Sequence, residues 1–594
     1  MKKFFTVFLL IAALLIPLGA AAYDFEAGGI YYNITGSNTA SVTYKDTNYN
    51  CYSGTVSIPS SVTSGGVQYT VTSIGRFAFR ANPNLTAVNI PNSVTTLEYA
   101  SFYQCTGLTS MSIPSSVTLL EQFVFRNCSS LTQVTFANPN TEIWAQAFQY
   151  CTSLTDVTLP QALENIGAGL FYGCTALEHI DIPSTVTSIY MYAFYNCVNL
   201  AEINIPDATV DIATDAFENT AWYDNQPDGV IYAGKVAFGY KGQMPSNTNI
   251  TLASDTRAIG TAAFNGQDNL AGITIPASVC HVGLNCLGDC ESLTRITVES
   301  GNTTYDSRNN CNAIIETASN TLVAGCMNTV IPNTVTGIGS YAFNYCTGLT
   351  EINLPNSITT IGERAFRGCI RLTSITIPAS VNSIGATICS ECYNLKTMKV
   401  ANGNTTYDSR NNCNAIIETA TNTVIAGCAH TVIPDGITTI GDHAFYGQFN
   451  MTYVVIPATV TSIANYGFQL QSEYYNQLKT TICKAVTPPA MTGTSFHYIS
   501  YEQGVLYVPR ASISAYQNDE WWGRFVDIRA IEDLKNGDVN DDGNIDISDA
   551  TTLISYLLNG DVSAIRIYNA DFNQDGTVDI SDATRLISFL LNGY

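Results

Sequence analysis

The apolar residues of this chain recur with a period of 23 residues. The period is clearest for a phenylalanine that two small or apolar residues usually precede and, in most units, a cysteine follows three positions later. The phenylalanines in this register are Phe79, Phe102, Phe125, Phe148, Phe171, Phe194 and Phe217, then Phe264, Phe343, Phe366, Phe445 and Phe468. A fixed period of about 20–50 residues is typical of a repeat solenoid, in which each unit is one turn.

One unit illustrates the elements that the pattern predicts. Residues 349–355 alternate so that Ile352 and Leu354 share one apolar face, which indicates a short β-strand. Pro355 ends this strand, because proline cannot donate a hydrogen bond to a neighbouring strand. A second short stretch ending in Ile361-Gly362 follows, and then Phe366 enters the interior. A single unit cannot bury this surface alone, so neighbouring units must stack.

The cysteines follow the same repeat. Nine of the eighteen lie three residues after the phenylalanine position: Cys105, Cys128, Cys151, Cys174, Cys197, Cys290, Cys346, Cys369 and Cys392. We expect a buried ladder of thiols in which cysteine serves as a small apolar residue. Use of this ladder in disulfides or metal binding is the alternative.

Two insertions interrupt the period. The step from Leu287 to Phe343 is 56 residues, and so is the step from Cys389 to Phe445. Each gap contains the same 16 letters, NTTYDSRNNCNAIIET, at residues 302–317 and 404–419. The sequence around this block predicts a β-hairpin in which two cysteines of opposite strands face each other. The candidate disulfides are Cys311 with Cys326 and Cys413 with Cys428, and free thiols are the alternative. Each bridge would contribute about 3 kcal/mol.

The chain divides into five expected regions. Lys2 and Lys3, the apolar run 4–18 and the small residues 19–22 form a secretory signal peptide, residues 1–22, so we expect an exported protein. Residues 23–66 are an expected N-terminal β cap and residues 473–535 a C-terminal cap. The solenoid spans residues 67–472, with hairpin insertions near 222–245, 300–330 and 402–432. Residues 536–594 form a separate C-terminal region.

That end contains two twelve-residue acidic loops, 33 residues apart, each followed by an apolar helix. Oxygens at loop positions 1, 3, 5, 7, 9 and 12 can enclose a hard cation, and glycine at position 6 allows the turn. The candidate calcium ligands are Asp538, Asn540, Asp542, Asn544, Asp546 and Asp549 in the first loop. In the second loop they are Asp571, Asn573, Asp575, Thr577, Asp579 and Asp582. Two calcium ions are therefore expected.

This duplicated loop and helix resembles a type I dockerin, over residues 536–594. The resemblance implies calcium-dependent binding to a cohesin-type scaffold protein, as in cellulosome-like assemblies that degrade polysaccharides. In the family, loop positions 10 and 11 contact cohesin, and here they are Ile547 with Ser548 and Ile580 with Ser581. Because the two copies agree, either one can face a partner.

Residues 23–533 resemble the BspA-like leucine-rich repeat proteins of bacterial surfaces. The 23-residue unit, the Ile-Pro marker, the Ala-Phe-x-x-Cys marker and the segment Leu506–Pro509 carry this resemblance. It implies a leucine-rich repeat solenoid of short β-strands and a secreted or cell-surface protein used in adhesion. It does not name the protein or glycan ligand.

Composition narrows the function further. Only 12% of the residues are charged, and 25 basic residues stand against 48 acidic ones, so the net charge is −23. Such a chain suits neither nucleic acid nor an anionic membrane surface. No apolar run in the mature chain is long enough for a membrane span. The five histidines form no metal-binding pair, and no nucleophile motif is present.

We therefore expect a non-catalytic binding protein. In this hypothesis the solenoid recognises a protein or glycan ligand, and the dockerin attaches it to a scaffold. The alternatives are a purely structural spacer and a polysaccharide-active component of the glycoside hydrolase type.

Overall fold

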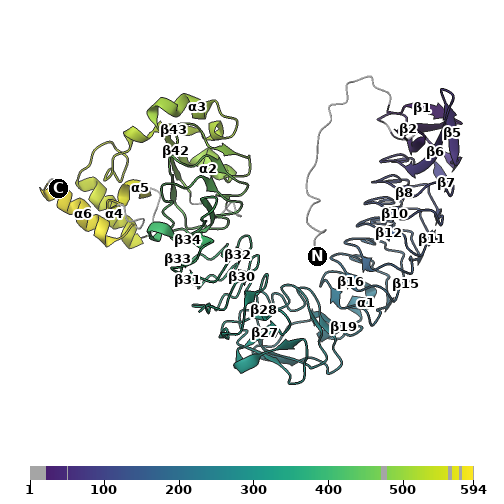
Figure 1. The fold of residues 1–594 in the computed structure, drawn as a ribbon, viewed down its shortest axis with the longest axis horizontal. Coiled ribbons are helices and arrows are strands. Elements are labelled where there is room, and N and C mark those ends of the chain that lie inside the picture. The colour runs from purple at the N-terminus through teal and green to yellow at the C-terminus, as the bar shows by residue number, and fades with distance from the viewer. Residues whose placement is uncertain are drawn as a thin grey trace. The chain divides into compact units, whose positions relative to one another are not determined.

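The computed structural model describes residues 22–47, 49, 51–469, 478–559, 565–573 and 578–592. The expected signal peptide lies almost wholly outside these residues. The chain separates into two compact units, Met1–Phe238 and Gly239–Tyr594. Figure 1 shows the element order.

The first unit begins with a β-sheet that covers the start of the repeats. Its strands pair in the order β1, β2, β3 and β6, and β5 adds to β6. Their bounds are β1 Phe25–Ala27, β2 Ile30–Gly36, β3 Thr39–Thr43, β5 Ser61–Ser64 and β6 Val67–Ile74. Tyr32, fully buried, and Tyr52 pack beneath this sheet, so the first repeat does not expose its apolar end.

Each repeat of the first unit contributes a strand to each of two parallel ladders. The two-residue strands are β8 Thr96–Leu97, β10 Leu119–Leu120, β12 Glu142–Ile143, β14 Asn165–Ile166, β16 Ser188–Ile189 and β18 Asp211–Ile212. The longer ones are β4 Gly54–Ser57, β7 Leu85–Asn89, β9 Ser110–Ile113, β11 Gln133–Phe136, β13 Asp156–Thr158, β15 His179–Asp181 and β17 Glu202–Asn204. The register is the sequence period itself, because Gln133 pairs with Ser110 and with Asp156. The unit closes with α1 Ala221–Asp224, β19 Gly229–Ala233 and the start of β20 Val236–Lys241.

The second unit is also built from two parallel ladders. Its longer strands are β21 Thr248–Thr251, β23 Leu270–Ile275, β25 Arg295–Val298, β31 Ser374–Ile377, β33 Thr397–Val400, β38 Tyr453–Ile456 and β40 Thr480–Cys483. Its shorter strands are β22 Ala258–Ile259, β24 His281–Val282, β29 Gly337–Ile338, β30 Thr360–Ile361, β32 Ser383–Ile384, β37 Thr439–Ile440, β39 Ser462–Ile463 and β41 Ala490–Met491. The predicted solenoid of short β-strands is confirmed.

The core is a stack of phenylalanine rings. From Phe79 to Phe217, successive rings lie 5.0–5.6 Å apart and within 20° of parallel. All seven side chains are fully buried. Offset stacking at this distance is a favourable aromatic geometry, so each turn stabilises the next.

Eight of the nine ladder cysteines are buried, as expected, and Cys346 is partly buried. The ladder also has a polar role. The Cys105 thiol donates a hydrogen bond to the carbonyl oxygen of Phe79, 26 residues earlier, at 2.8 Å. The same bond joins Cys128, Cys151, Cys174, Cys197, Cys290, Cys369 and Cys392 to the phenylalanine of the previous turn. A cysteine therefore fills a small apolar space and satisfies a buried carbonyl at once.

The two insertions join the parallel strand ladder of the repeats. The hairpin strands are β26 Tyr305–Asp306, β27 Ala313–Glu316 and β28 Thr321–Gly325, and in the second copy β34 Tyr407–Asp408, β35 Ala415–Glu418 and β36 Thr423–Gly427. In each copy the last strand pairs in parallel with the next repeat strand, β28 with β29 and β36 with β37. Across the gap, the Asp289 amide donates to the Asn344 carbonyl at 3.1 Å. The hairpin is thus built into the ladder.

The predicted pairing of the hairpin cysteines is wrong in register. At the hairpin tip Glu316 pairs with Thr321, but a β-bulge between Ile314 and Ile315 shifts the pairing, so Ala313 pairs with Gly325. Continued outward, this register places Cys326 opposite Asn312 instead of Cys311. The second copy has the same bulge. Cys311, Cys326, Cys413 and Cys428 are buried free thiols, which contradicts the disulfide prediction.

The chain beyond the last repeat covers the C-terminal end of the stack. It contains α2 Tyr498–Gln503, β42 Val505–Val508, α3 Ile513–Gln517 and β43 Asp527–Ala530, with 3-10 turns at Arg510–Ser512, Trp522–Arg524 and Ile531–Asp533. The Trp522 side chain is fully buried and donates from Nε1 to the Pro489 carbonyl at 2.8 Å. Its ring lies 5.7 Å from Phe496, which stacks on Phe468.

We expect Phe148→Ala to lower the free energy of unfolding by about 3–5 kcal/mol, because it leaves a cavity in the ring stack. The exposed residue Thr152, four positions away, provides the control, and Thr152→Ala should change stability by less than about 0.5 kcal/mol. Urea unfolding followed by circular dichroism measures both midpoints. Equal midpoints for the two variants would show that the ring stack does not carry the stability.

Thiol alkylation tests the free cysteines. In the native protein at pH 8 the exposed Cys280 should react first, because burial raises the pKa of Cys105 to about 12 and so removes its thiolate. In concentrated guanidinium chloride without reductant, all eighteen cysteines should become alkylated. Mass spectrometry counts the labels. A species with two unlabelled cysteines would restore the disulfide hypothesis.

Candidate functional site

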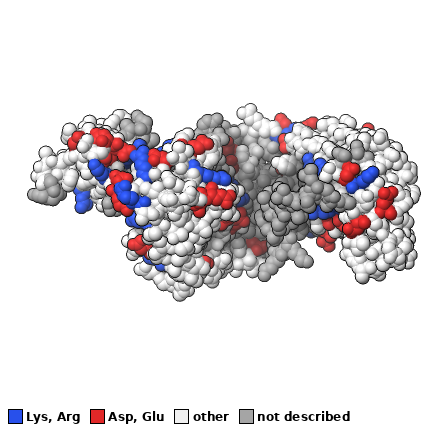
Figure 2. Space-filling model, turned by 90° about the horizontal axis from the view of Figure 1, so that it is seen from above, with Lys and Arg blue, Asp and Glu red and all other residues white. Residues whose placement is uncertain are grey.

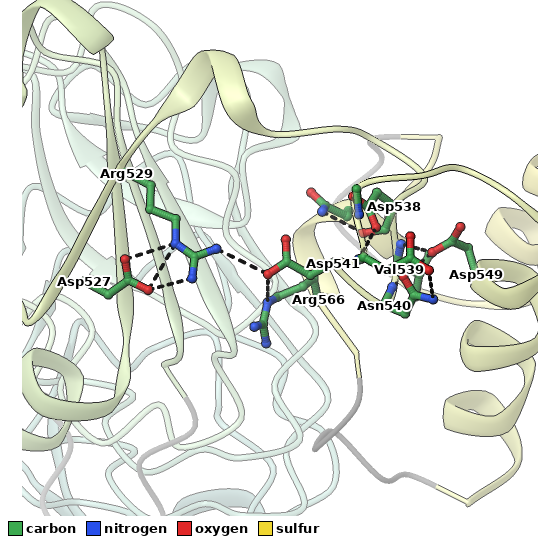
Figure 3. Close-up of polar contacts among 11 residues, drawn as sticks. Asp527, Arg529, Asp538, Val539, Asn540, Asp541, Asp549 and Arg566 are labelled. Carbon is green, nitrogen blue, oxygen red and sulfur yellow. Dashed lines mark hydrogen bonds and ion pairs between the residues drawn. The ribbon is translucent and has the colours of Figure 1, made fainter.

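The first acidic loop is closed by the helix that follows it. Helix α4, Ile547–Asn559, begins within the loop, so its first turn holds Asp549 in place. The Asp549 carboxylate is fully buried and accepts hydrogen bonds from the backbone amides of Val539 at 2.6 Å, Asn540 at 3.0 Å and Asp546 at 2.8 Å. Figure 3 shows this carboxylate turned back onto the start of the loop.

Asp538 lies at the other end of the loop and is also buried. Its two carboxylate oxygens accept hydrogen bonds from the amides of Asp542 and Gly543, each at 3.0 Å. Burial, and to a smaller extent the negative charge of Asp549, raises the pKa of Asp538. Two buried carboxylates that repel each other in one loop are the donor arrangement that a hard cation stabilises.

The second loop repeats this arrangement where the structure describes it. Helix α6, Ile580–Asn592, holds Asp582, whose buried carboxylate accepts from the amides of Asn573 at 3.0 Å and Asp579 at 2.9 Å. Asp571 is buried as well. Asp575 and Thr577, two of the expected ligands, lie outside the described residues. A short helix precedes this loop, α5 Ile567–Ala570, which the sequence did not predict.

The remaining expected ligands of the first loop lie on its exposed side. The Asn540 side-chain amide donates to Asp542 at 2.9 Å and to Ser548 at 2.8 Å, and Asn544 and Asp546 are exposed. Within the described part of the chain, no three His, Cys, Asp or Glu side chains converge on one point as a metal requires. The oxygen donors nevertheless fit calcium, since a turn of the Asn540 amide would present its oxygen to the buried carboxylates.

A cluster of ion pairs ties the first loop to β43, the last strand of the C-terminal cap. Asp541, at loop position 4, pairs with Arg529 of β43 at 3.3 Å and with Arg566 at 3.1 Å. Arg529 also pairs with Asp527 at 2.7 Å, so one chain of charges joins the strand to the loop (Figure 3). Asp541 is not a ligand position, and its role was not visible in the sequence.

The second loop also contacts the repeats. The Tyr453 hydroxyl of β38 donates to the Asp571 carboxylate at 3.0 Å. The Tyr453 ring packs edge-on against Tyr568 of α5 at 5.6 Å. The first loop is thus anchored by the C-terminal cap and the second by one of the last repeats.

Helices α4 and α6 pack against each other and leave matching apolar residues exposed. The buried side includes Leu553 and Leu586 at equivalent positions. On the outer side, Ile547 and Ile580 are 70% and 71% exposed, and Leu558 and Leu591 are each 77% exposed. Ser548 and Ser581 accept hydrogen bonds from Asn540 and Asn573, so these two hydroxyls are tied to their loops. The two helices therefore present the same surface twice.

Comparison with known families identifies both parts of the chain. The model of the BspA type leucine-rich repeat region matches in six copies, over residues 45–164, 141–242, 235–326, 323–423 and 422–512. This chain is a BspA-type leucine-rich repeat protein. The model of the dockerin type I domain matches residues 536–591, so the two helices and their loops are a type I dockerin domain.

Solved structures of bacterial leucine-rich repeat proteins are similar to this chain. A protein from Bacteroides ovatus is 23% identical over 74% of this chain and 95% of its own, with a TM-score of 0.31. A cell surface protein from Faecalibacterium prausnitzii is 20% identical over 85% and 94%, with a TM-score of 0.26. No curated protein matches the chain.

The family gives the coarse properties of the site. Type I dockerin domains bind calcium, and proteins with BspA-type repeats and dockerins are typically extracellular or attached to the cell surface. No helix in the described ranges combines the length and apolar character of a membrane span.

Asp541→Asn should loosen the dockerin from the repeats, because it weakens two partly exposed ion pairs worth about 1 kcal/mol together. We expect backbone amides of residues 536–545 to exchange hydrogen about fivefold faster at low salt, and the difference should shrink at high salt. Hydrogen exchange with mass spectrometry measures this rate. Glu520→Gln, an exposed carboxylate that loses the same charge, is the control, and equal exchange in both variants would contradict the role of Asp541.

Proposed function

We propose that this protein is a secreted, non-catalytic binding protein whose dockerin attaches it to a cohesin-type scaffold. The duplicated exposed surface on α4 and α6 carries the proposal. On each helix two large apolar side chains at equivalent positions are at least 70% exposed, so the same partner surface fits either copy. Ile547 and Leu558 form one patch, and Ile580 and Leu591 form the other.

Two calcium ions hold this surface in shape. The ligands of the first are Asp538, Asn540, Asp542, Asn544, Asp546 and Asp549, and those of the second are Asp571, Asn573, Asp575, Thr577, Asp579 and Asp582. Asp549 and Asp582 each lie in the first turn of the helix that carries the exposed patch. Calcium bound to these carboxylates fixes the start of the helix, and with it Ile547 and Ser548 or Ile580 and Ser581, which meet the partner.

The repeats supply the second binding function. They expose polar and aromatic side chains over many turns, and an extended array of this kind suits a long ligand, a glycan or a protein. The scaffold would then hold the ligand-binding solenoid within a polysaccharide-degrading assembly. The polypeptide has no part in the chemistry of degradation in this proposal.

A capture experiment tests the docking step. The mature chain, immobilised, should retain a scaffold protein from the secreted and envelope fractions of the source organism in calcium and release it in chelator. Mass spectrometry should show cohesin modules in the retained protein. Retention that is independent of calcium, or no retention despite calcium binding measured by titration, would contradict the proposal.

Variants of the two patches test the duplication. Ile547→Asp with Leu558→Asp should leave capture nearly unchanged, and so should Ile580→Asp with Leu591→Asp, because one intact patch suffices. All four substitutions together should reduce capture at least tenfold. Val330→Asp with Val432→Asp, which adds charge at exposed valines of the two hairpins, is the control and should capture normally.

A further inference from the structure

Three arginines of the first unit lie on aromatic rings at the surface of the first repeats. The Arg80 guanidinium lies 4.9 Å from the centre of the Tyr49 ring and 5.5 Å from that of Tyr103. Arg126 lies 4.9 Å from the Phe123 ring and 5.9 Å from Tyr103, and Arg76 lies 5.0 Å from Tyr99. We call Arg76, Arg80 and Arg126 with these rings the arginine–aromatic face.

None of these three guanidinium groups forms an ion pair with any residue that the structure describes. Seven of the other arginines form ion pairs within the described residues, so pairing is common but not general in this chain. In the second unit Arg367, at the repeat position of Arg80 and Arg126, pairs with the buried Glu391 at 2.7 Å. Residues 22–238 contain five basic and 17 acidic residues, so arginines without carboxylate partners are not explained by a shortage of acids.

A shallow groove of about 680 Å³ runs beside this face. Two positions of the repeat line it, residues 81, 104, 127 and 150 and residues 83, 106, 129 and 152. Six of its eight lining side chains carry an amide or a hydroxyl group, such as Gln104, Asn127 and Thr106, but most of the surface that they expose is carbon. Residues 80, 103 and 126 do not line the groove themselves but directly precede lining residues in the sequence, so the arginine–aromatic face adjoins the groove along the chain. At its far end Tyr150 packs on Tyr172 at 5.1 Å, and Tyr172 stacks on Tyr195 at 5.0 Å.

The backbone of the groove is already satisfied. The amide of Gln104 donates to the Arg126 carbonyl at 2.9 Å, and the amide of Asn127 donates to the Gln149 carbonyl at 2.8 Å. An extended peptide would find no strand edge to pair with here, and a shallow groove offers no deep pocket for an anchoring side chain. Side-chain amides, hydroxyls and ring faces are what the groove presents.

We propose that the arginine–aromatic face and its groove bind an acidic polysaccharide, a chain of sugars that carry carboxylates. Hydroxyl groups of the sugars meet the amide and hydroxyl ladder, sugar faces pack on the tyrosine rings, and carboxylates pair with the guanidinium groups. Each guanidinium is held by its rings, so little side-chain entropy is lost when it accepts a planar carboxylate in a two-pronged pair. Figure 2 shows how few charged side chains the visible surface carries overall.

The spacing and number of the cations favour this ligand over nucleic acid. Arg80 and Arg126 are two repeats apart, which is about 10 Å at a strand spacing of about 4.8 Å. Carboxylates at intervals along a sugar chain match such sparse cations. A single-stranded nucleic acid binds through many phosphate contacts, which three arginines do not supply.

This inference rests on the proposed binding function of the repeats and names its ligand class. The test is isothermal titration of the mature chain with polygalacturonate and with its fully methyl-esterified form, which differs only in charge. The buffer contains no calcium, because polygalacturonate binds that ion. We expect binding of the acid form and at least tenfold weaker binding of the ester. Arg80→Gln with Arg126→Gln should weaken binding of the acid form at least tenfold and reduce its salt dependence.

Arg257→Gln with Arg371→Gln, which removes two exposed arginines of the second unit, is the matched control and should bind as the native chain does. Circular dichroism establishes that both variants are folded. Equal binding of acid and ester, or an Arg80/Arg126 variant that binds normally, would overturn the inference but leave the proposed function intact. Stronger binding of poly-glutamate or of an oligothymidylate would instead assign the face to a peptide or a nucleic acid. Failure of the whole secreted glycan and protein pool to bind the repeats would overturn both.

Discussion

The fold depends on one constraint, that a 23-residue turn cannot bury its own apolar side. Most turns supply one phenylalanine ring, and Leu287 and Cys389 take its place in two others. Each of these side chains is covered by the turns before and after it. The turn must also satisfy a buried carbonyl at the same place, which the cysteine thiol of the next turn does. Where the cysteine is missing, another donor takes its position: the Asn82 amide bonds to the Tyr49 carbonyl at 2.7 Å. The caps follow from the same constraint, because the first and last rings need a cover.

The sequence predicted the repeated features well, because repetition makes a weak local signal strong. Phe79 alone could belong to many structures, but a phenylalanine at every step of 23 permits few. The register of the hairpins was missed by one residue because a bulge at Ile314 and Ile315 leaves no mark in the alternation of apolar and polar residues. In the sequence the insertions look like interruptions of the repeat, but in the structure their last strands continue the ladder. The sequence could not show this, because strand pairing between distant residues has no local signature.

In the acidic loops, too, the repeated features were predictable from the sequence and the unique contacts were not. The buried positions of Asp538, Asp549, Asp571 and Asp582 agree with a loop pattern that two copies share. The contacts that anchor those loops, from Asp541 to Arg529 and from Tyr453 to Asp571, join residues 12 and 118 positions apart and occur once each. Unique long-range pairs of this kind cannot be read from periodicity. The unpaired arginines of the first unit belong to the same class, because only the structure shows which charges have no partner.

The two hairpin blocks are copies in geometry as well as in text. The Val282 amide donates to the Tyr305 hydroxyl and the Ile384 amide to the Tyr407 hydroxyl, each at 3.1 Å. Arg308 and Arg410 each pair with the aspartate two residues earlier in their own block. The block recurs after 102 residues, which is a whole number of structural layers, since its last strand rejoins the ladder in register. Unequal recombination between the two copies would therefore add or delete a complete segment without disturbing the rings on either side. The number of repeats could thus change in fixed steps of one segment. The length of the solenoid would change in this way while the N-terminal repeats and the dockerin stayed the same.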